Sequence, residues 1–147
     1  MGRLTWSVGD VVYLDTDVVI YSVERAEPYY SLLLPLWTAA NASEVQLAGS
    51  ELLLLETMVL PLRQGNIQLQ TAFRNLLLHT PFQLVPISRH ILDQAARVRA
   101  ASTIKTPDSI HAATALSAKC TGFLTNDRGL ARVAGLSVQV LDSILAE

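Results

Sequence analysis

Four carboxylates stand where an apolar run of the chain ends or where a helix is expected to begin. Asp15 directly follows the run VVYL, and Asp127 comes two residues after the run TGFLT. Asp108 falls in the first turn expected for TPDSIHAATAL, and Glu56 ends the stretch SELLLLE. In open α/β sheets, ligands bind at the carboxyl ends of the strands, where residues of this kind meet. The spacing therefore predicts one acidic site.

Each acid also has an ordinary structural explanation. Asp15 could cap the following helix, and Asp108 is favoured in a first turn by the helix dipole. Asp127 could form an Asx turn, and Glu56 could reach solvent at the edge of a crevice. Because the same arrangement recurs four times, a shared function explains the pattern better than four separate coincidences.

Four carboxylates at one edge of a sheet repel one another unless a cation lies among them. Two like charges about 5 Å apart cost about 3 kcal/mol at an effective dielectric constant of about 20. Mg²⁺ and Mn²⁺ prefer oxygen ligands, and Mg²⁺ often takes its remaining ligands from water and phosphate. The acids therefore predict a Mg²⁺ (or Mn²⁺) site that promotes attack of water on a phosphodiester. The chain has no GxSxG elbow and no Gly-rich phosphate loop that would indicate other chemistry.

Other polar residues accompany the acids. His111 follows Asp108 by one helical turn on the same side, and we expect a hydrogen-bonded histidine at the margin of the site. Lys105, Arg128 and Arg132 lie in or beside the same segments and could contact phosphates. The alternative for each of these cations is a solvated surface charge.

An alternation of strands and helices would position these residues. Apolar runs rich in β-branched residues predict strands, and the segments between them have helical periodicity. We therefore expect an α/β fold, a three-layer α/β/α sandwich with a central, mainly parallel sheet of about five strands, formed by residues 1–147 as a single domain. The predicted strands are 10–14, 44–49, 82–86, 121–125 and 136–141. The predicted helices are 17–24, 29–41, 51–64, 67–79, 88–102 and 106–119, with a helical turn at 127–133.

Composition and charge narrow the class of protein. Half of the 147 residues are apolar and 16% are charged, which is typical of a compact folded chain. The net charge of −2 excludes attraction of nucleic acid by bulk charge, so any such binding needs a local patch. The one cysteine, Cys120, cannot form an internal disulfide, and no signal peptide or membrane-spanning run is apparent. These features predict a cytoplasmic protein.

The segment PYYSLLLPLW, residues 28–37, is apolar on nearly every face of the expected helix. One helix cannot bury all of that surface against one core, so we expect Tyr30, Leu33 and Trp37 to form a partner surface. The alternative is burial under neighbouring helices.

The order of the motifs LDTDVVIY, SELLLLE, TPDSIHAATAL and FLTNDRGL resembles that of PIN-domain nucleases, and above all of the VapC-type toxins of VapBC toxin–antitoxin modules. The resemblance covers about residues 10–141, and the last two motifs are the most specific. It implies a PIN-like fold and Mg²⁺- or Mn²⁺-dependent endoribonuclease activity on structured RNA such as tRNA or rRNA. It also implies a homodimer and a cognate antitoxin that covers the active site.

Carried over residue by residue, the resemblance assigns catalysis and metal binding to the four acids named above. Thr125 and Asn126 match the polar residues beside the fourth acid. Asp17 stands where family members often carry Asn or Ser, so it departs from the pattern and adds a charge. The resemblance implies that Asp17 supports the ligands rather than being one.

Two other functions fit part of the sequence. The stretch DTDVV resembles the DxDx(T/V) motif of haloacid-dehalogenase-like phosphatases, in which Asp15 would be the nucleophile and Asp17 a general acid. That interpretation leaves Glu56 and the TPDSIHAATAL stretch without a role, and the late acidic pair of that family is missing. A non-catalytic PIN-like binding scaffold is the second alternative. A receiver-type signalling domain is disfavoured because no acidic residue ends the strand FQLVP.

Overall fold

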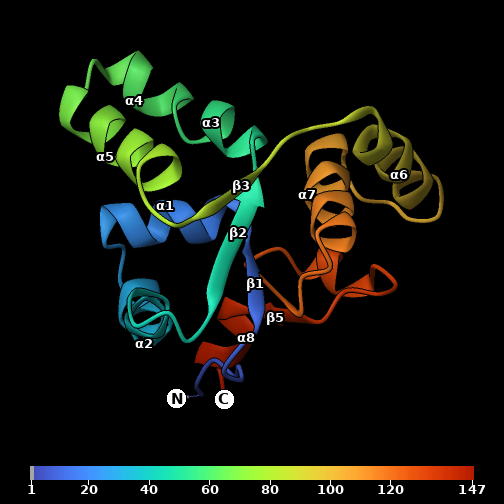
Figure 1. Ribbon diagram of the computed structural model, residues 1–147, viewed down its shortest axis with the longest axis horizontal. Helices are drawn as coiled ribbons and strands as arrows, with labels where there is room; N and C mark the ends of the chain where they lie inside the picture. Colours follow the sequence, from blue (N-terminus) through green and yellow to red (C-terminus); the bar gives the residue numbers. More distant parts are fainter. Residues whose placement is uncertain (1) are drawn as a thin grey trace.

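A five-stranded parallel sheet forms the centre of the computed structural model, which describes residues 2–147 (Figure 1). The strand order is β3-β2-β1-β4-β5, and each neighbouring pair is parallel. The expected α/β class with a parallel sheet of about five strands is confirmed. The strands are β1 (Val11–Leu14), β2 (Gln46–Ser50), β3 (Gln83–Val85), β4 (Gly122–Thr125) and β5 (Val138–Val140).

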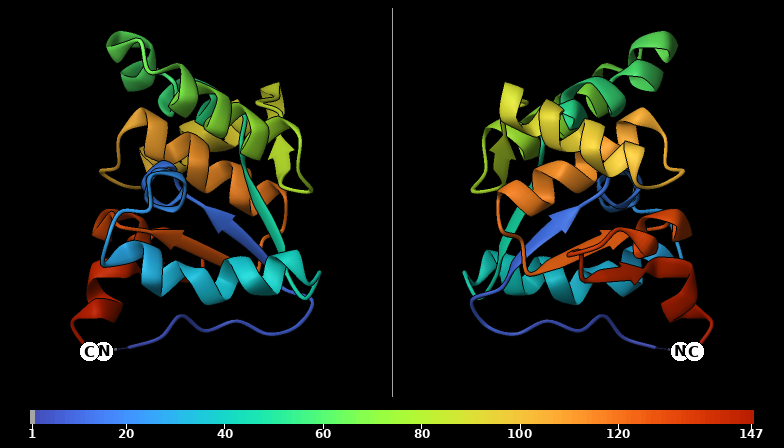
Figure 2. Two further views of the ribbon diagram at one scale, coloured as in Figure 1. Left: turned by 90° about the vertical axis from the view of Figure 1, so that its left-hand side faces the viewer. Right: turned by 90° about the vertical axis from the view of Figure 1, so that its right-hand side faces the viewer.

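Helices cover both faces of this sheet and complete the three layers (Figure 2). One face packs against α1 (Thr16–Glu24), α2 (Tyr29–Asn41), α5 (Ile67–Leu78) and α8 (Leu141–Leu145). The other face packs against α7 (Thr106–Ser117), which is covered in turn by α6 (Arg89–Ala100). The remaining elements are α3 (Leu52–Glu56), α4 (Val59–Gln64) and the short 3₁₀ helix η1 (Arg128–Arg132).

The side chains of the central strand β1 alternate between the two layers of helices, as the pleat of a strand requires. Val12 and Leu14 are buried in the core on the α1 and α2 side. Tyr13 points the other way, where it is fully buried with Ala112 of α7 and stacks on Phe123 of β4 at 4.9 Å between ring centroids. A strand buried on both faces explains the unbroken apolar run in the sequence.

The helix predicted over 51–64 is in fact two short helices, α3 and α4, separated at Thr57 and Met58. Pro61 explains the break, because its ring clashes with the carbonyl of Thr57 and it has no N–H to donate there. The Thr57 hydroxyl donates to the carbonyl of Leu53, one turn earlier in α3, at 2.6 Å. Glu56 therefore lies at the C-terminus of a short helix rather than inside a long one.

The other predicted elements are present, with ends shifted by at most two residues. Helix α2 has the predicted bounds, whereas β2 begins at Gln46 rather than at Glu44. Helix α8 was not predicted, because its residues were assigned in part to the last strand and are few. Gly65 ends α4 in the left-handed region at φ 62°, and Asn66 then caps α5.

The two ends of the described chain lie beside each other (Figure 1). The backbone N–H of Gly2 donates to the carbonyl of Ile144 in α8 at 3.1 Å. Among residues 2–147, no helix has the length and apolar character needed to cross a bilayer.

Candidate active site

Asp15 lies at the carboxyl end of β1 and is also the N-cap residue of α1. Its Oδ1 accepts a hydrogen bond from the backbone N–H of Thr16 at 2.9 Å. Its Oδ2 accepts one from the hydroxyl of Thr125, at the end of the neighbouring strand β4, at 2.7 Å. The side chain is nearly buried. Asp15 can therefore cap α1 and also belong to a site, because its two hydrogen-bond donors orient the carboxylate at the edge of the sheet.

Thr125 connects Asp15 to the acid that follows β4. Its hydroxyl oxygen accepts a hydrogen bond from the backbone N–H of Asp127 at 2.9 Å while donating to Asp15. Asp127 itself is exposed, and its Oδ1 accepts from the N–H of Gly129 at 2.8 Å. This Asx turn opens η1 and holds the Asp127 carboxylate near the end of the strand.

Asp108 lies in the first turn of α7, beside the carboxyl of Asp127. Its pKa is raised to about 6, first by desolvation and then by interaction with the Asp127 carboxyl and by the negative charge of Asp15, while His111 opposes the shift. Helix α7 begins at Thr106, and Lys105 is its N-cap residue without a side-chain hydrogen bond to the helix. Three acids from three segments thus meet at one edge.

Glu56 reaches the same edge from the end of α3. Its Oε1 accepts hydrogen bonds from the Thr16 hydroxyl at 2.6 Å and from Nε2 of His111 at 2.7 Å. Burial raises the pKa of Glu56, but the bonds from His111 and Thr16 outweigh it, so the pKa is lowered overall. His111 Nε2 also lies 3.7 Å from Oδ1 of Asp15, which links Glu56 to the other acids.

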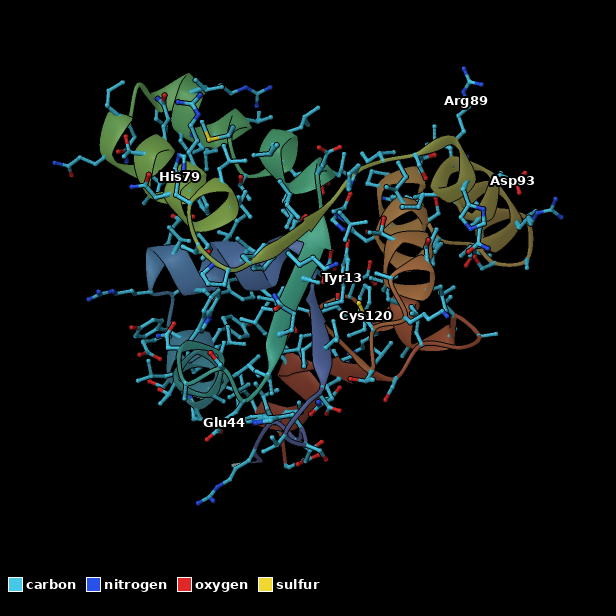
Figure 3. All side chains as sticks on the ribbon, in the orientation of Figure 1. Tyr13, Glu44, His79, Arg89, Asp93 and Cys120 are labelled. Atoms are coloured by element: carbon cyan, nitrogen blue, oxygen red, sulfur yellow. The ribbon has the colours of Figure 1, made fainter. Side chains whose placement is uncertain are left out.

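His111 and Tyr13 form a buried pair beside these acids. His111 is 1% exposed and Tyr13 is fully buried, and the Tyr13 hydroxyl lies 2.5 Å from Nδ1 of His111. Figure 3 places Tyr13 in the middle of the molecule, between the sheet and α7. Sequence reasoning placed His111 at the margin of the site but missed Tyr13. The sequence feature that could have identified Tyr13 is a phenol in the middle of an otherwise apolar strand, because a buried hydroxyl needs a hydrogen-bond partner.

Asp17 is exposed in the first turn of α1, close to the other acids. Its pKa is raised by desolvation and by the charges of Asp15, Glu56 and Asp127, with His111 opposing them. No side-chain hydrogen bond of Asp17 occurs in residues 2–147. It therefore adds negative charge to the site without being held in one orientation.

Asn126 does not face the acids. Its side-chain amide donates to the hydroxyls of Tyr21 and Tyr29, each at 3.3 Å, and its Oδ1 accepts from the N–H of Asp142 at 2.9 Å. The two tyrosine rings stack at 4.1 Å, and Tyr29 donates to Asp142 at 2.7 Å. We expected Asn126 to support the acids. Its hydrogen bonds instead connect α1 and α2 to the start of α8.

Lys105, Arg128 and Arg132 are exposed on segments that also carry Asp108 and Asp127. None of the three forms an ion pair within residues 2–147, in contrast to Arg97, which pairs with Asp93 on α6 at 3.1 Å. Within the described residues, their cationic groups are therefore exposed and not engaged by a carboxylate.

The expected partner surface on α2 is wrong for Leu33, which is fully buried in the core. Tyr30 is partly buried and packs beneath Arg25, whose guanidinium carbon lies 5.7 Å from the ring centroid. Trp37 is also partly buried and donates from Nε1 to the hydroxyl of Ser22 in α1 at 2.8 Å. Packing against α1 and the sheet covers most of this helix, which was the alternative interpretation.

The acidic cluster has the donors that a hard divalent cation prefers, since carboxylate oxygens come from Asp15, Glu56, Asp108 and Asp127. Within residues 2–147, no three His, Cys, Asp or Glu side chains lie close enough together to hold a metal as they stand. The raised pKa of Asp108 beside Asp127 identifies excess negative charge, and within residues 2–147 no Lys or Arg forms an ion pair with these acids. The residues therefore fit a divalent cation by chemistry and charge.

A cavity of about 600 Å³ lies elsewhere, at the amino ends of β1 and β2. Its lining includes Trp37, Glu44 and Phe82, and none of the acids described above. The acids occupy the opposite, carboxyl edge of the sheet, where ligands of open α/β folds bind.

Comparison with known proteins agrees with this arrangement. The sequence model of the family described as "PIN domain" matches residues 12–136. No curated protein sequence matches the chain.

Solved structures share the fold at low sequence identity. VapBC2 from Rickettsia felis, bound to a DNA fragment from its promoter, aligns with a TM-score of 0.68 and 17% identity over 88% of this chain and 98% of that one. VapC20 from Mycobacterium tuberculosis, described as a sarcin-ricin loop cleaving toxin, aligns with a TM-score of 0.68 and 17% identity over 85% and 95%. A toxin–antitoxin complex from Klebsiella pneumoniae aligns with a TM-score of 0.64 and 20% identity over 88% and 96%.

The family match spans β1 through η1 and includes every element that carries one of the four acids. With the three-layer fold and the acidic edge described above, it establishes that this chain belongs to the PIN domain family.

Proposed function

We propose that this protein is a Mg²⁺- or Mn²⁺-dependent endoribonuclease that hydrolyses RNA phosphodiester bonds, and that it is the toxin of a type II toxin–antitoxin pair acting in the cytoplasm. The single observation that carries the proposal is the meeting of Asp15, Glu56, Asp108 and Asp127 at one edge of the sheet. Membership of the PIN domain family, whose members are generally nucleases, supports it.

The stability of the fold does not require these acids to be together. Burial and mutual repulsion raise the pKa of Asp108 and of Asp17, which means that their ionised forms are disfavoured in the metal-free protein. A protein with a stability of about 5–15 kcal/mol gains nothing from such a cluster unless it binds a cation. Strongly perturbed carboxyls at a sheet edge are typical of a functional site.

The residues of such a site would have different roles. Thr16 and Thr125 hold the Asp15 carboxylate in one orientation, and the turn at Gly129 holds Asp127. Asp15, Asp108, Asp127 and Glu56 would hold the cation. When bound, a divalent ion activates water for in-line attack and offsets the charge on the leaving oxygen. Lys105, Arg128 and Arg132 would hold the RNA backbone through phosphate contacts, with tRNA or rRNA as the expected substrate class.

A cognate antitoxin and a homodimer complete the proposal. The fold is shared with a chain of the toxin–antitoxin complex from Klebsiella pneumoniae, and this likeness supports an antitoxin for the present chain. Exposed apolar side chains of α3 and α4, namely Leu55, Leu60 and Leu62, at 62%, 56% and 56% exposure, support a second copy as an additional partner.

Cleavage of total cellular RNA by the purified protein tests the nuclease proposal. We expect discrete fragments with Mg²⁺ or Mn²⁺, none with EDTA, and a loss of at least about 100-fold in rate for Asp108→Asn, because a metal ligand is removed. Asp93→Asn on α6 is the matched control, since Asp93 is exposed and extends away from the body of the molecule (Figure 3).

Fragments that are equal in wild type and Asp108→Asn would come from a contaminant and would contradict the proposal. Metal binding without cleavage of any RNA would point instead to the non-catalytic scaffold.

A further inference from the structure

A continuous line of hydrogen bonds runs from the end of β2 through two buried side chains to Glu56. The backbone N–H of Ser50 donates to the Tyr13 hydroxyl at 3.1 Å. That hydroxyl lies 2.5 Å from Nδ1 of His111, and Nε2 of His111 lies 2.7 Å from Oε1 of Glu56. Only the last member of the line reaches solvent, because the Glu56 side chain is 24% exposed.

Which group donates in each of these hydrogen bonds follows from the number of protons that each group carries. The Tyr13 oxygen already accepts from Ser50, and its own proton needs an acceptor. Within residues 2–147, Nδ1 of His111 is the acceptor in reach, so Nδ1 carries no proton and Nε2 does. The Nε2–H of His111 is therefore donated toward Oε1 of Glu56 at 2.7 Å, with the hydroxyl oxygen of Thr16 3.0 Å from the same nitrogen.

The rings have little freedom to change this arrangement. Tyr13 stacks on Phe123 on one side and packs edge-on against His111, with ring centroids 5.8 Å apart. Both side chains are almost entirely buried, so water does not compete for their polar atoms. A histidine whose second nitrogen is held by a fixed partner has one tautomer and one orientation.

The consequence for Glu56 is that its two oxygens differ. Oε1 receives two donors, the hydroxyl of Thr16 and Nε2 of His111. Oε2 has no hydrogen-bond partner within residues 2–147, so it is the oxygen available to a ligand. The hydrogen bonds also fix the carboxylate plane, which a glutamate at the end of a short helix would otherwise sample freely.

We infer that Tyr13 and His111 are positioning residues: the Tyr13 hydroxyl fixes the ring of His111, and His111 Nε2–H fixes Oε1 of Glu56 so that Oε2 faces the metal. The part of this inference that concerns the metal rests on the proposed function. The part that concerns the orientation of Tyr13 and His111 does not. A merely structural pair would fill the core without affecting metal affinity.

Three variants separate these roles. His111→Gln keeps an N–H donor near the position of Nε2, whereas His111→Asn places its amide near Nδ1 and cannot reach Glu56. Tyr13→Phe keeps the ring and its stacking but removes the hydroxyl. Thermal unfolding and circular dichroism identify variants that retain the fold before further measurement.

The first readout is the ¹⁵N NMR spectrum of the His111 imidazole in the metal-free protein. We expect the Nε2–H tautomer in wild type and a mixture of tautomers in Tyr13→Phe. The second readout is Mn²⁺ affinity by calorimetry. We expect a dissociation constant about tenfold higher in His111→Asn and Tyr13→Phe, and within about threefold of wild type in His111→Gln.

A proton on Nδ1 of His111 in the wild type would overturn the inference, as would equal Mn²⁺ affinity in all folded variants. If His111→Asn does not fold, Tyr13→Phe and the NMR spectrum decide the question. If the wild type binds no Mn²⁺, the proposed function fails, whereas the imidazole spectra still decide whether Tyr13 positions His111.

Discussion

At the scale of single residues, the site is built from carboxylates whose hydrogen bonds differ. Asp15 accepts two donors and is nearly buried, so its orientation is fixed by Thr16 and Thr125. Asp108 instead lies beside the carboxyl of Asp127, and desolvation and the neighbouring acids raise its pKa. The metal-free site is therefore strained electrostatically at Asp108, and this strain has a measurable dependence on pH.

Asp108→Asn should stabilise the metal-free protein at neutral pH. The folded-state pKa of Asp108, about 6, exceeds the ordinary value of 3.8, so the folded protein binds this proton more tightly than the unfolded chain does. The associated stability is fully present below about pH 3.8 and is lost as the pH rises through about 6. After discounting for partial exposure, we expect Asp108→Asn to raise the free energy of unfolding by about 1 kcal/mol at pH 8.

Urea unfolding in EDTA at pH 5 and pH 8 provides the measurement, and the difference between wild type and variant should shrink at the lower pH. Asp93→Asn, which removes an exposed acid outside the site, serves as the control. A constant difference across this range would contradict the assigned pKa.

At the scale of elements, Pro61 and Asn126 determine how the helices are arranged around the site. Pro61 separates α3 from α4 and so leaves Glu56 at a helix end facing His111. Asn126 ties α1 and α2 to α8 directly beside the strand end that carries Asp127. Two apolar residues of α4 face outward, since Leu60 and Leu62 are each 56% exposed.

Leu60→Glu should weaken a homodimer if α3 and α4 form its interface. A charge placed in a buried apolar interface costs several kcal/mol unless it is paired, so we expect the monomer to predominate. Leu92→Glu on α6 is a matched control, because Leu92 is 49% exposed but has no exposed large apolar neighbour on its helix. Light scattering coupled to gel filtration gives the masses. A wild-type monomer, or an unchanged dimer in Leu60→Glu, would exclude this interface.

At the scale of the whole molecule, the net charge is −2, but the charged residues are unevenly distributed along the chain. Seven of the eleven Lys and Arg residues lie between positions 89 and 132, together with only three of the thirteen Asp and Glu residues. This segment runs through α6, α7 and η1, which form one side of the molecule (Figure 1). A polyanion would thus meet positive potential beside the acidic edge, although the chain as a whole is acidic.

Replacing Lys105, Arg128 and Arg132 by Gln should weaken RNA binding and its salt dependence. Each lost phosphate contact lowers the slope of log K against log salt by about 0.7 to 0.9, so we expect a decrease of about 2 to 3. The measurement uses Asp108→Asn as the background, so that RNA is not cleaved. Replacement of Arg3, Arg63 and Arg74 by Gln is the control, because these exposed cations are remote in sequence from the segment 89–132 and change the net charge equally. Equal losses in the two triple variants would indicate a bulk charge effect.

The sequence by itself determined the class of fold and the identity of the acids. Apolar runs without polar interruption predict strands buried on both faces, and their alternation with helices leaves few topologies other than a parallel sheet. Asp15 and Asp127 were predictable because the carboxyl ends of parallel strands share one edge. The proximity of Lys105, Arg128 and Arg132 to these motifs in the chain predicts phosphate contacts, and this role stays a prediction.

Only the tertiary structure decided which side chains face one another. The burial of Leu33 depends on how α2 packs against α1 and the sheet, which the apolar character of the segment does not reveal. Asn126 is adjacent to Asp127 in sequence, but successive side chains need not point to the same site. Tyr13 and His111 are separated by 98 positions and meet only because β1 lies beneath α7. Hydrogen bonds between distant segments depend on distances of a few tenths of an ångström, which residue types and spacing along the chain do not determine.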